Sequence, residues 1–536
     1  MRIAIALAVA LSAVQRPLAQ PSTPKLAVIL VVDQMRADYI DRFQKDWTGG
    51  LKRLVSEGAV FQNAAYPYLT TVTCPGHATI ATGTFPRRHG IVQNQWWDRE
   101  RHASMTCTED PRAAGVGYRT RIRNGDSPWR LQRPTLTDVM RSQVDAHVVS
   151  LSLKDRSAIM LAGHGGNAVT WLSDSLEGWM TSSAFADRPV PAAKSFVDAN
   201  AISADFGKTW SLLLPAARYA ERDDDATEAP PRGWTRTFPH VLNGATDERD
   251  AAFFAQWERS PFADEYLGRF AGAMVDAFSL GRHAGTDVLA VSFSAPDFLG
   301  HAFGPRSVEV HDLYLRLDRT IGALLDHIDA SVGRGQWVAA LTADHGVTAI
   351  PEQLIAQGQS AGRLTASLVS AAVEARLRDK LGAGKHVASV NTNDVYFVDG
   401  VFEKLERSPE LLHAVVRAVS EIPGIARVFP STQLRDPAVA TDPEQRAAAI
   451  GYFPGRSGDL ILVPKPGWMF VGSGTTHGGA HPDDQRVPII FLGSGIRPGR
   501  HQDAVTPADI APTLAAICGV RLPDVDGRVL GGALIH

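Results

Sequence analysis

The chain has 536 residues, of which 44% are hydrophobic and 21% are charged, and its formal net charge is −3. This length suits one large α/β domain with insertions, or two domains. The nearly balanced charge excludes the basic face of a dedicated nucleic-acid-binding protein and a basic membrane-binding run, and no apolar stretch beyond the N-terminus is long enough for a transmembrane helix.

The first twenty residues have the pattern of a secretory signal peptide. Arg2 precedes an apolar run from Ile3 to Val14, and small residues follow before Gln20. The run is short for a membrane span, although an uncleaved anchor or a buried strand is the alternative. We therefore expect residues 1–20 to be removed and residues 25–536 to form a periplasmic or secreted protein.

Apolar runs rich in β-branched residues predict the strands of a mostly parallel sheet, and helical patterns lie between them. The expected strands are 25–33, 146–154, 287–297, 336–345 and 487–495. The expected helices include 49–58, 310–329 and 506–519, the last with Thr506 as its N-cap and Pro507 in its first turn. This alternation predicts an α/β fold with helices on both faces of a central sheet.

Two long stretches interrupt the alternation. Residues from about 160 to 280 contain Trp171, Trp179 and Trp210, and we expect an insertion that lies over the edge of the sheet. An accessory Ca²⁺ site at the acidic run 221–233 within it stays open as an alternative. Residues from about 350 to 485 combine a helical pattern at 367–381 with strand-like runs at 393–399 and 459–470, which predicts a smaller inserted α+β lobe.

The chain contains three cysteines, Cys74, Cys107 and Cys518. So few cysteines allow at most one disulfide and exclude a disulfide-stapled scaffold. Cys107 could pair with Cys74 or with Cys518, and the sequence does not decide between them. Cys74 has no neighbouring histidine in a dyad pattern, and a buried, small apolar role is expected for it.

Three of the predicted strands end in an aspartate, namely Asp33, Asp297 and Asp344. Side chains at the carboxyl ends of parallel strands meet in one crevice of an open α/β sheet. Three carboxylates gathered there repel one another unless cations neutralise them. The pattern therefore predicts a metal site.

Histidines complete the predicted ligand set. His301 follows Asp297 by four residues, which places both on one face if this segment is helical. His345 is adjacent to Asp344, and His477 and His481 precede the last predicted strand. Mixed Asp and His ligation without thiolates is typical of catalytic zinc.

The stretch TVTCPGHATIATG, residues 71–83, predicts a helix that Thr73 caps and that contains Pro75 in its first turn. The N-terminus of this helix would direct N–H groups and a positive dipole end at an anion such as phosphate. A threonine hydroxyl is a weak nucleophile unless a divalent metal lowers its pKa. Thr73 is therefore the candidate nucleophile, with a plain capping role as the alternative.

Taken together, several motifs resemble the alkaline phosphatase superfamily, and among its members the exported bacterial alkaline phosphatases with a threonine nucleophile. These motifs are VVDQMRADY, TVTCPGHATIATG, HGIVQNQWWD, SLKDRSAI, SAPDFLGH, TADHG and SGTTHGG, and the C-terminal DIAPTLAAICGV extends the likeness over almost all of the mature chain. The resemblance implies the hydrolysis of small phosphate esters, foremost monoesters, through a phosphothreonine intermediate.

Carried over by position, the resemblance implies two Zn²⁺ ions. One would be bound by Asp297, His301 and His477, and the other by Asp33, Asp344 and His345 together with Thr73. His481 competes with His477 for a ligand position, and the T-T-H-G pattern favours His477.

The resemblance further implies that Asn94 binds a phosphoryl oxygen and that Lys154 and Arg156 favour monoesters, because a cation compensates the second charge of a monoester. A nucleotide pyrophosphatase/phosphodiesterase is the nearest alternative, since such enzymes typically lack the Lys/Arg pair, and some diester activity is expected in either case. A sulfatase needs a cysteine where this chain has Thr73. An exported phosphate- or metal-binding protein without turnover would need no nucleophile.

Overall fold

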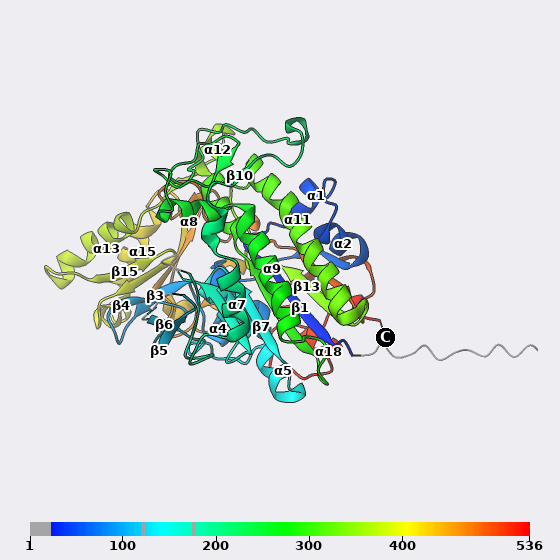
Figure 1. The fold of residues 1–536 in the computed structure, drawn as a ribbon. Coiled ribbons are helices and arrows are strands. Elements are labelled where there is room, and N and C mark those ends of the chain that lie inside the picture. Colours follow the sequence, from blue (N-terminus) through cyan, green and yellow to red (C-terminus); the bar gives the residue numbers. More distant parts are fainter. Residues whose placement is uncertain (1–22, 120–121, 123, 174–177, 536) are drawn as a thin grey trace, which may run out of the picture.

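The computed structural model describes residues 23–119, 122, 124–173 and 178–535, so the predicted signal peptide lies outside the described residues. An eleven-stranded sheet forms the centre of the described chain (Figure 1). In sheet order its strands are β21 (Gly499–Val505), β2 (Ala59–Ala64), β20 (Ile489–Gly493), β13 (Trp337–Thr342), β1 (Leu26–Val32), β12 (Asp287–Phe293), β7 (Val148–Ser152), β8 (Ala168–Leu172), β9 (Trp179–Ser182), β5 (Glu109–Gly117) and β6 (Asn124–Asp126).

The middle of the sheet is parallel. Strands β13, β1, β12, β7 and β8 pair parallel in that order, and every residue of β1 is buried because helices cover both faces. All five predicted strands are present. The sheet is mostly parallel as expected, but one of these five strands, β20, runs antiparallel to β13 and to β2. An apolar run carries no signal for strand direction, which depends on how the chain returns to the sheet.

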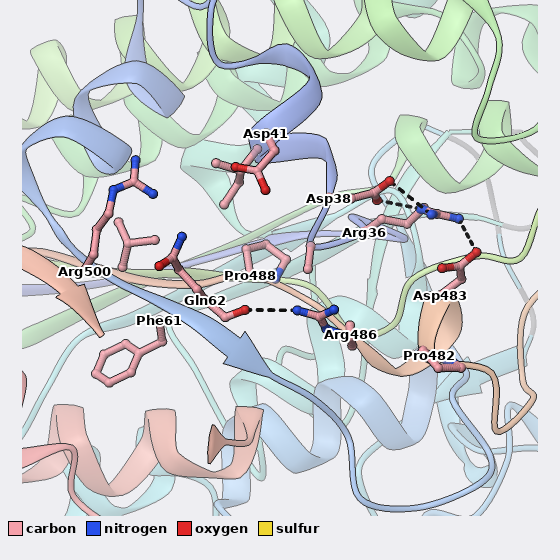
Figure 2. A pocket seen from close by; sticks show the side chains of 13 residues that line it. Arg36, Asp38, Asp41, Phe61, Gln62, Pro482, Asp483, Arg486, Pro488 and Arg500 are labelled. Carbon is pink, nitrogen blue, oxygen red and sulfur yellow. Dashed lines mark hydrogen bonds and ion pairs between the residues drawn. The ribbon is translucent and has the colours of Figure 1, made fainter. Parts of the chain in front are cut away.

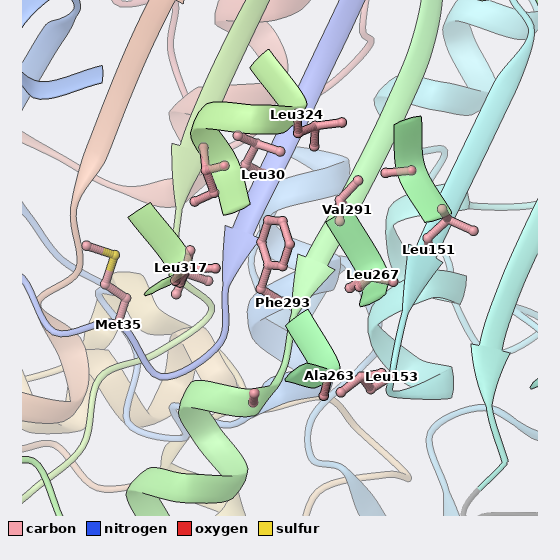
Figure 3. Packing of buried hydrophobic residues seen from close by; sticks show 14 of the residues in the cluster. Leu30, Met35, Leu151, Leu153, Ala263, Leu267, Val291, Phe293, Leu317 and Leu324 are labelled. Atoms are coloured by element: carbon pink, nitrogen blue, oxygen red, sulfur yellow. The ribbon is translucent and has the colours of Figure 1, made fainter. Parts of the chain in front are cut away.

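Alternate residues of each central strand pack against a different helical layer. On one face Leu30, Val291 and Phe293 contact a core to which α11 (Val308–Ile328) contributes Leu317 and Leu324 (Figure 3). Helices α2 (Gly50–Glu57) and α9 (Pro261–Ala277) complete this layer. The opposite face packs against α3 (Thr73–Thr82), α5 (Leu136–Val144) and α18 (Ile510–Ile517).

The helix predictions agree with the structure to within a few residues. Helix α2 covers most of the predicted 49–58, and α11 covers most of 310–329, with Ser307 Oγ accepting a hydrogen bond from Val310 N at 3.2 Å. The segment from 506 begins with a 3₁₀ turn, Pro507–Asp509, before α18. Asp509 Oδ2 accepts a hydrogen bond from Thr506 N at 2.9 Å there, which is one half of a capping box.

The segment predicted as an insertion at about 160–280 contributes to the central sheet as well as to its surroundings. Trp171 and Trp179 lie on β8 and β9, which are strands of the eleven-stranded sheet. Beyond them the chain forms α7 (Pro191–Ala199), α8 (Ala251–Glu258) and α9. Trp210 Nε1 donates to Asp312 Oδ1 of α11 at 2.6 Å, which attaches this segment to the helical layer. The bounds of the insertion stay a prediction.

The later stretch forms a smaller α+β lobe with its own apolar core. Strands β15 (Val387–Asn391), β16 (Asp394–Phe397), β18 (Leu460–Pro464) and β17 (Ile425–Pro430) form an antiparallel sheet in this order. Helices α13 (Ala366–Leu381) and α15 (Pro409–Ser420) pack against it. Asn393 Nδ2 donates to Gly478 O at 2.6 Å, which joins the lobe to the loop that carries His477. The predicted α/β class with a smaller lobe is confirmed.

Candidate active site

Four adjacent parallel strands end at one place and deliver most of the candidate residues. Asp33 follows β1, Lys154 lies two residues after β7, and Asp344 and His345 follow β13. After β12 the chain turns into α10 (Ala295–Phe303), whose first turn carries Asp297. The carboxyl ends of neighbouring parallel strands therefore converge as the sequence predicted, and they enclose a buried polar site.

The side chains form two groups with the spacing of metal ligands. One nitrogen or oxygen atom from each of Asp33, Asp344 and His345 lies within 4.8 Å of the others, and the same holds for Asp297, His345 and His477. His345 thus belongs to both groups. The group expected from the resemblance contained His301 in place of His345, and His301 Nε2 lies 3.2 Å from Asp297 Oδ1 at the border of that second group.

The three histidines are oriented by the backbone. The Nδ1 atom of each ring lies 2.8–3.0 Å from a carbonyl oxygen, that of Thr475 for His301, Gly346 for His345 and Thr71 for His477. A carbonyl oxygen only accepts, so Nδ1 carries the proton and Nε2 keeps its lone pair. The Nε2 atoms face the carboxylates, at 3.3 Å from Asp344 for His345 and at 3.5 Å from Asp297 for His477. This is the orientation of metal-binding histidines.

The charge distribution also fits cations. The buried oxygens Asp33 Oδ1 and Asp344 Oδ2 accept no hydrogen bond from any described residue. Burial, and then the nearby carboxylate of Asp344, raises the pKa of Asp33 well above its usual value. Burial lowers the pKa of His345 to about 3, which keeps its imidazole neutral. Crowded carboxylates with unsatisfied oxygens beside the neutral imidazole of His345 are suited to divalent metal ions.

Lys154 places a cation between the two groups. Its Nζ donates to Asp33 Oδ2 at 2.7 Å and to Asp297 Oδ2 at 2.5 Å, and it lies 4.8 Å from the centre of the Phe298 ring. Burial acts to lower the pKa of Lys154, but Asp297 and Asp33 outweigh it and raise that pKa. Arg156 lies in the first turn of α6 (Asp155–Ala162), with Nη1 3.3 Å from Asp155 Oδ1.

Thr73 lies at the edge of the first group, with its hydroxyl 3.5 Å from His345 Nε2. It is the first residue of α3, and Val72 occupies the cap position, so the expectation that Thr73 caps the helix is wrong by one residue. Asn94 is adjacent, because its Oδ1 accepts from Cys74 N at 2.8 Å. This bond fixes the orientation of the amide. Its Oδ1 faces Cys74 N, so its Nδ2 group is the donor that it can offer to a ligand.

A disulfide joins Cys74 to Cys107, and Cys518 is a free, buried cysteine. The structure thus selects one of the two pairings that the sequence left open. It also corrects the expectation that Cys74 is only a small buried side chain. The bridge immediately follows Thr73, and Cys107 N donates to Asn94 O at 2.8 Å, so it fixes the backbone beside both residues.

Sequence reasoning gave no role to two polar residues inside the site. His77, one turn after Thr73, has Nδ1 2.9 Å from Thr73 O and 3.3 Å from Asp344 Oδ2. Gln34 Nε2 donates to Asp297 Oδ1 at 2.6 Å, and its backbone has a left-handed φ of 68°. A non-glycine residue in this conformation is uncommon and is typical of functional sites, but it cannot be read from sequence.

Arg36 fastens three of the loops that carry the site. Its Nη1 donates to Val347 O and to Asp483 Oδ2, both at 2.9 Å, and its Nε donates to Asp38 Oδ1 at 2.7 Å. Figure 2 shows this network at the side of a cleft of about 290 Å³ that contains none of the predicted ligands. Arg36 stands in the motif VVDQMRADY, but its partners are hundreds of residues away.

Two other candidates lie outside the ligand groups. His481 accepts a hydrogen bond from Asp483 N at 3.0 Å and caps α17 (Pro482–Gln485), in agreement with the preference for His477. In the acidic run, Glu221 binds Arg42 and His311. Within the described chain no carboxylate of this run belongs to a group of three close ligand atoms, and the accessory Ca²⁺ stays a prediction.

Comparison with known proteins assigns the family. Residues 27–484 match the family "Type I phosphodiesterase / nucleotide pyrophosphatase", and the chain belongs to this family. It is 31% identical to the alkaline phosphatase PafA of Elizabethkingia meningoseptica over 93% of this chain and 92% of that protein. The alkaline phosphatase PhoV of Synechococcus elongatus is 30% identical over 93% of this chain and 91% of its own length.

The crystal structure of wild-type PafA has the same fold. It superimposes with a TM-score of 0.87 at 30% identity, covering 96% of this chain and 99% of that one. The resemblance to the alkaline phosphatase superfamily is thereby confirmed. The chain is an enzyme of the alkaline phosphatase type, and it hydrolyses phosphate esters.

Proposed function

We propose that this enzyme hydrolyses phosphate monoesters through a phosphothreonine formed on Thr73, with two Zn²⁺ ions as cofactors. One observation carries the proposal: the hydroxyl of Thr73 lies 3.5 Å from His345 Nε2, and His345 belongs to both groups of close ligand atoms. A role as a mere helix cap would not need this position, and the residue at the cap position is Val72, not Thr73.

The residues around Thr73 fit the two cations. Asp33, Asp344 and His345 would hold one, and Asp297 and His477 would hold the other with His301 or His345. Oxygen and imidazole ligands without a thiolate favour zinc. Bound there, the ions would supply Lewis acidity, which lowers the pKa of a coordinated hydroxyl and stabilises negative charge on phosphoryl oxygens.

Thr73 Oγ1 forms a bond to phosphorus and the ester oxygen departs as the alcohol. Water then cleaves the phosphothreonine, releases inorganic phosphate and restores the hydroxyl. The N-terminal end of α3 points its N–H dipoles at the phosphoryl group during both steps. The Nδ2 group of Asn94, held in place by the Cys74 N–H bond, donates to a phosphoryl oxygen.

The preference for monoesters rests on Lys154 and Arg156. The buried ammonium of Lys154 lies between the two ligand groups, so a phosphoryl group bound there would contact it. A monoester carries nearly one more negative charge than a diester, and a fixed cation therefore favours its transition state. Phosphodiesters, which the family name includes, would be slower substrates at the same site.

The test of the nucleophile is Thr73→Ala, measured as phosphate release from an aryl phosphate and as covalent label from a ³²P-labelled substrate. We expect loss of the label and of turnover, with zinc content unchanged. Thr70→Ala, which alters a threonine three residues earlier in the chain, is the matched control and keeps both. A labelled intermediate in the Thr73→Ala protein would exclude this residue as the nucleophile.

We also propose that the enzyme works in the periplasm or outside the cell. The Cys74–Cys107 disulfide supports this location, because such bonds persist in oxidising compartments. Among the helices that the structure describes, none combines the length and apolar character that crossing a membrane requires. Fractionation of cells that express the full chain tests the proposal, and activity confined to the cytoplasmic fraction would contradict it.

A further inference from the structure

A second cluster of potential ligands lies at the opposite end of the same strands. His147 immediately precedes β7, Asp287 is the first residue of β12, and His283 lies in the loop that connects α9 to β12. The candidate active site follows the carboxyl ends of β7 and β12, whereas this cluster precedes their amino ends. A seven-residue strand spans roughly 20 Å, so the two sites are separate.

The three side chains share one centre. His283 Nδ1 lies 2.6 Å from Asp287 Oδ2 and His147 Nδ1 lies 3.6 Å from Asp287 Oδ1, and one ligand atom from each residue lies within 4.8 Å of the others. The two imidazole rings stack with centroids 3.7 Å apart and an angle of 26° between their planes. Both rings therefore present Nδ1 to the same carboxylate.

The backbone holds the carboxylate in place. His147 N donates to Asp287 Oδ1 at 2.9 Å, and Gly281 N donates to Oδ2 at 2.8 Å. Asp287 is completely buried, and these two backbone donors would orient its carboxylate even without the imidazole rings. These contacts preorganise one arm of a ligand set before any cation arrives.

Hydrogen bonds among the described residues do not satisfy every polar atom of this cluster. His147 Nδ1 is buried and has no hydrogen-bond partner among the described residues, and its distance to Asp287 is too long for a hydrogen bond. Two protonated imidazoles stacked face to face would repel each other, so charging both rings does not resolve it. A divalent cation would satisfy both Nδ1 atoms and the carboxylate together once the rings turn from their stacked orientation to direct both lone pairs at it.

We propose that His147, His283 and Asp287 form a third cation site, selective for zinc-like divalent transition metals. Two imidazoles and a carboxylate are ligands that zinc favours, whereas calcium and magnesium prefer all-oxygen sites. On binding, the proton that His283 Nδ1 shares with Asp287 passes to solvent. Each histidine side chain is about one-third exposed, at 34% and 31%, so water can supply the fourth ligand.

Such a cation has a structural role. It ties the loop that contains His283 to the starts of β7 and β12, two central strands that end in the candidate active site. A ligand that binds only the folded chain raises its stability according to its concentration and affinity. The site would therefore make the stability of the whole enzyme depend on zinc, without taking part in the chemistry.

The experiment is metal analysis of the full-length protein after dialysis against zinc. We compare the native chain with His283→Gln and with the double variant His147→Gln, His283→Gln. We expect each variant to bind one zinc fewer per chain than the native protein and to lose part of the rise in Tm that zinc produces. Phosphatase activity should stay within twofold, which also shows that the variants fold.

The matched control is His164→Gln, because His164 pairs with Asp138 at 2.8 Å and belongs to no group of three close ligand atoms in the described chain. It should keep the native zinc content. The difference of one zinc between native and variant chains is expected whether or not zinc is bound at the active site, so the two proposals fail separately. Equal zinc content and equal zinc-dependent Tm in native and variant proteins would overturn the third site.

Discussion

Replacing Lys154 by methionine tests the monoester preference most directly. The change removes the charge and keeps most of the apolar stem that lies near Phe298. Lys154 Nζ is buried and lies 2.7 Å and 2.5 Å from two candidate ligand carboxylates. One additional unit charge on the substrate at ~4 Å from this cation, at an effective dielectric constant of ~20, interacts by about 4 kcal/mol.

This energy converts to a loss of selectivity. About 3–4 kcal/mol corresponds to a factor of ~10²–10³ in kcat/KM, the range found for removing one charge-stabilising donor from an active site. The assay compares an aryl phosphate monoester with a methyl aryl diester that has the same leaving group. We expect kcat/KM for the monoester to fall ~10²–10³-fold further than that for the diester.

Two controls accompany this variant. Zinc content must be measured, because Asp33 and Asp297 lose a partner when the ammonium is removed. Lys194→Met removes an exposed lysine that pairs with Asp198 at the surface and should leave both substrates unaffected. Equal losses on the monoester and the diester, at native zinc content, would refute the assignment of Lys154 to the extra phosphoryl charge.

Three further predictions concern cations, the disulfide and pH. Removing bound metal with a chelator should abolish phosphate release and adding zinc should restore it, while full activity of metal-free protein would contradict the two-cation proposal. Replacing Cys74 and Cys107 by serine removes a cross-link that spans 33 residues and should lower the free energy of unfolding by ~4 kcal/mol. The measurement is urea unfolding with Cys518→Ser as the control, and an unchanged free energy of unfolding would contradict the prediction. Burial raises the pKa of Asp264 to about 7, so the native chain keeps a proton that the unfolded chain loses near pH 4. The contribution of Asp264 to stability should therefore fall by up to ~4 kcal/mol between pH 4 and 7. In urea unfolding at pH 5 and 8, Asp264→Asn should make the change in stability between the two pH values less negative than in the native chain, and an equal change in both proteins would contradict this.

The central strands and their terminal aspartates could be predicted from sequence because both signals are local. A run of β-branched residues predicts a buried strand, and a polar residue at its end marks the sheet edge where ligands bind. Asp33, Asp297 and Asp344 all lie at that edge. The direction of β20 was beyond this reasoning, since an apolar run reads the same in either orientation.

The missed residues share a different property, which is that their partners are remote. Arg36 contacts Asp483 across 447 positions, and Gln34 contacts Asp297 across 263. No local pattern distinguishes them from ordinary surface polar residues. The choice of Cys74 as the partner of Cys107, and the place of His345 in both ligand groups, likewise depend on distances that only the folded chain defines.

Because the disulfide lies next to Thr73, the positioning of the proposed nucleophile depends on whether Cys74 and Cys107 have been oxidised. Cys74 is the next residue after the proposed nucleophile, and Cys107 N bonds to the backbone of Asn94. A newly made chain in a reducing cytoplasm lacks this covalent brace, so we expect its nucleophile segment to be held less firmly there. With the export proposed above, the disulfide would form only after the chain has left the reducing cytoplasm.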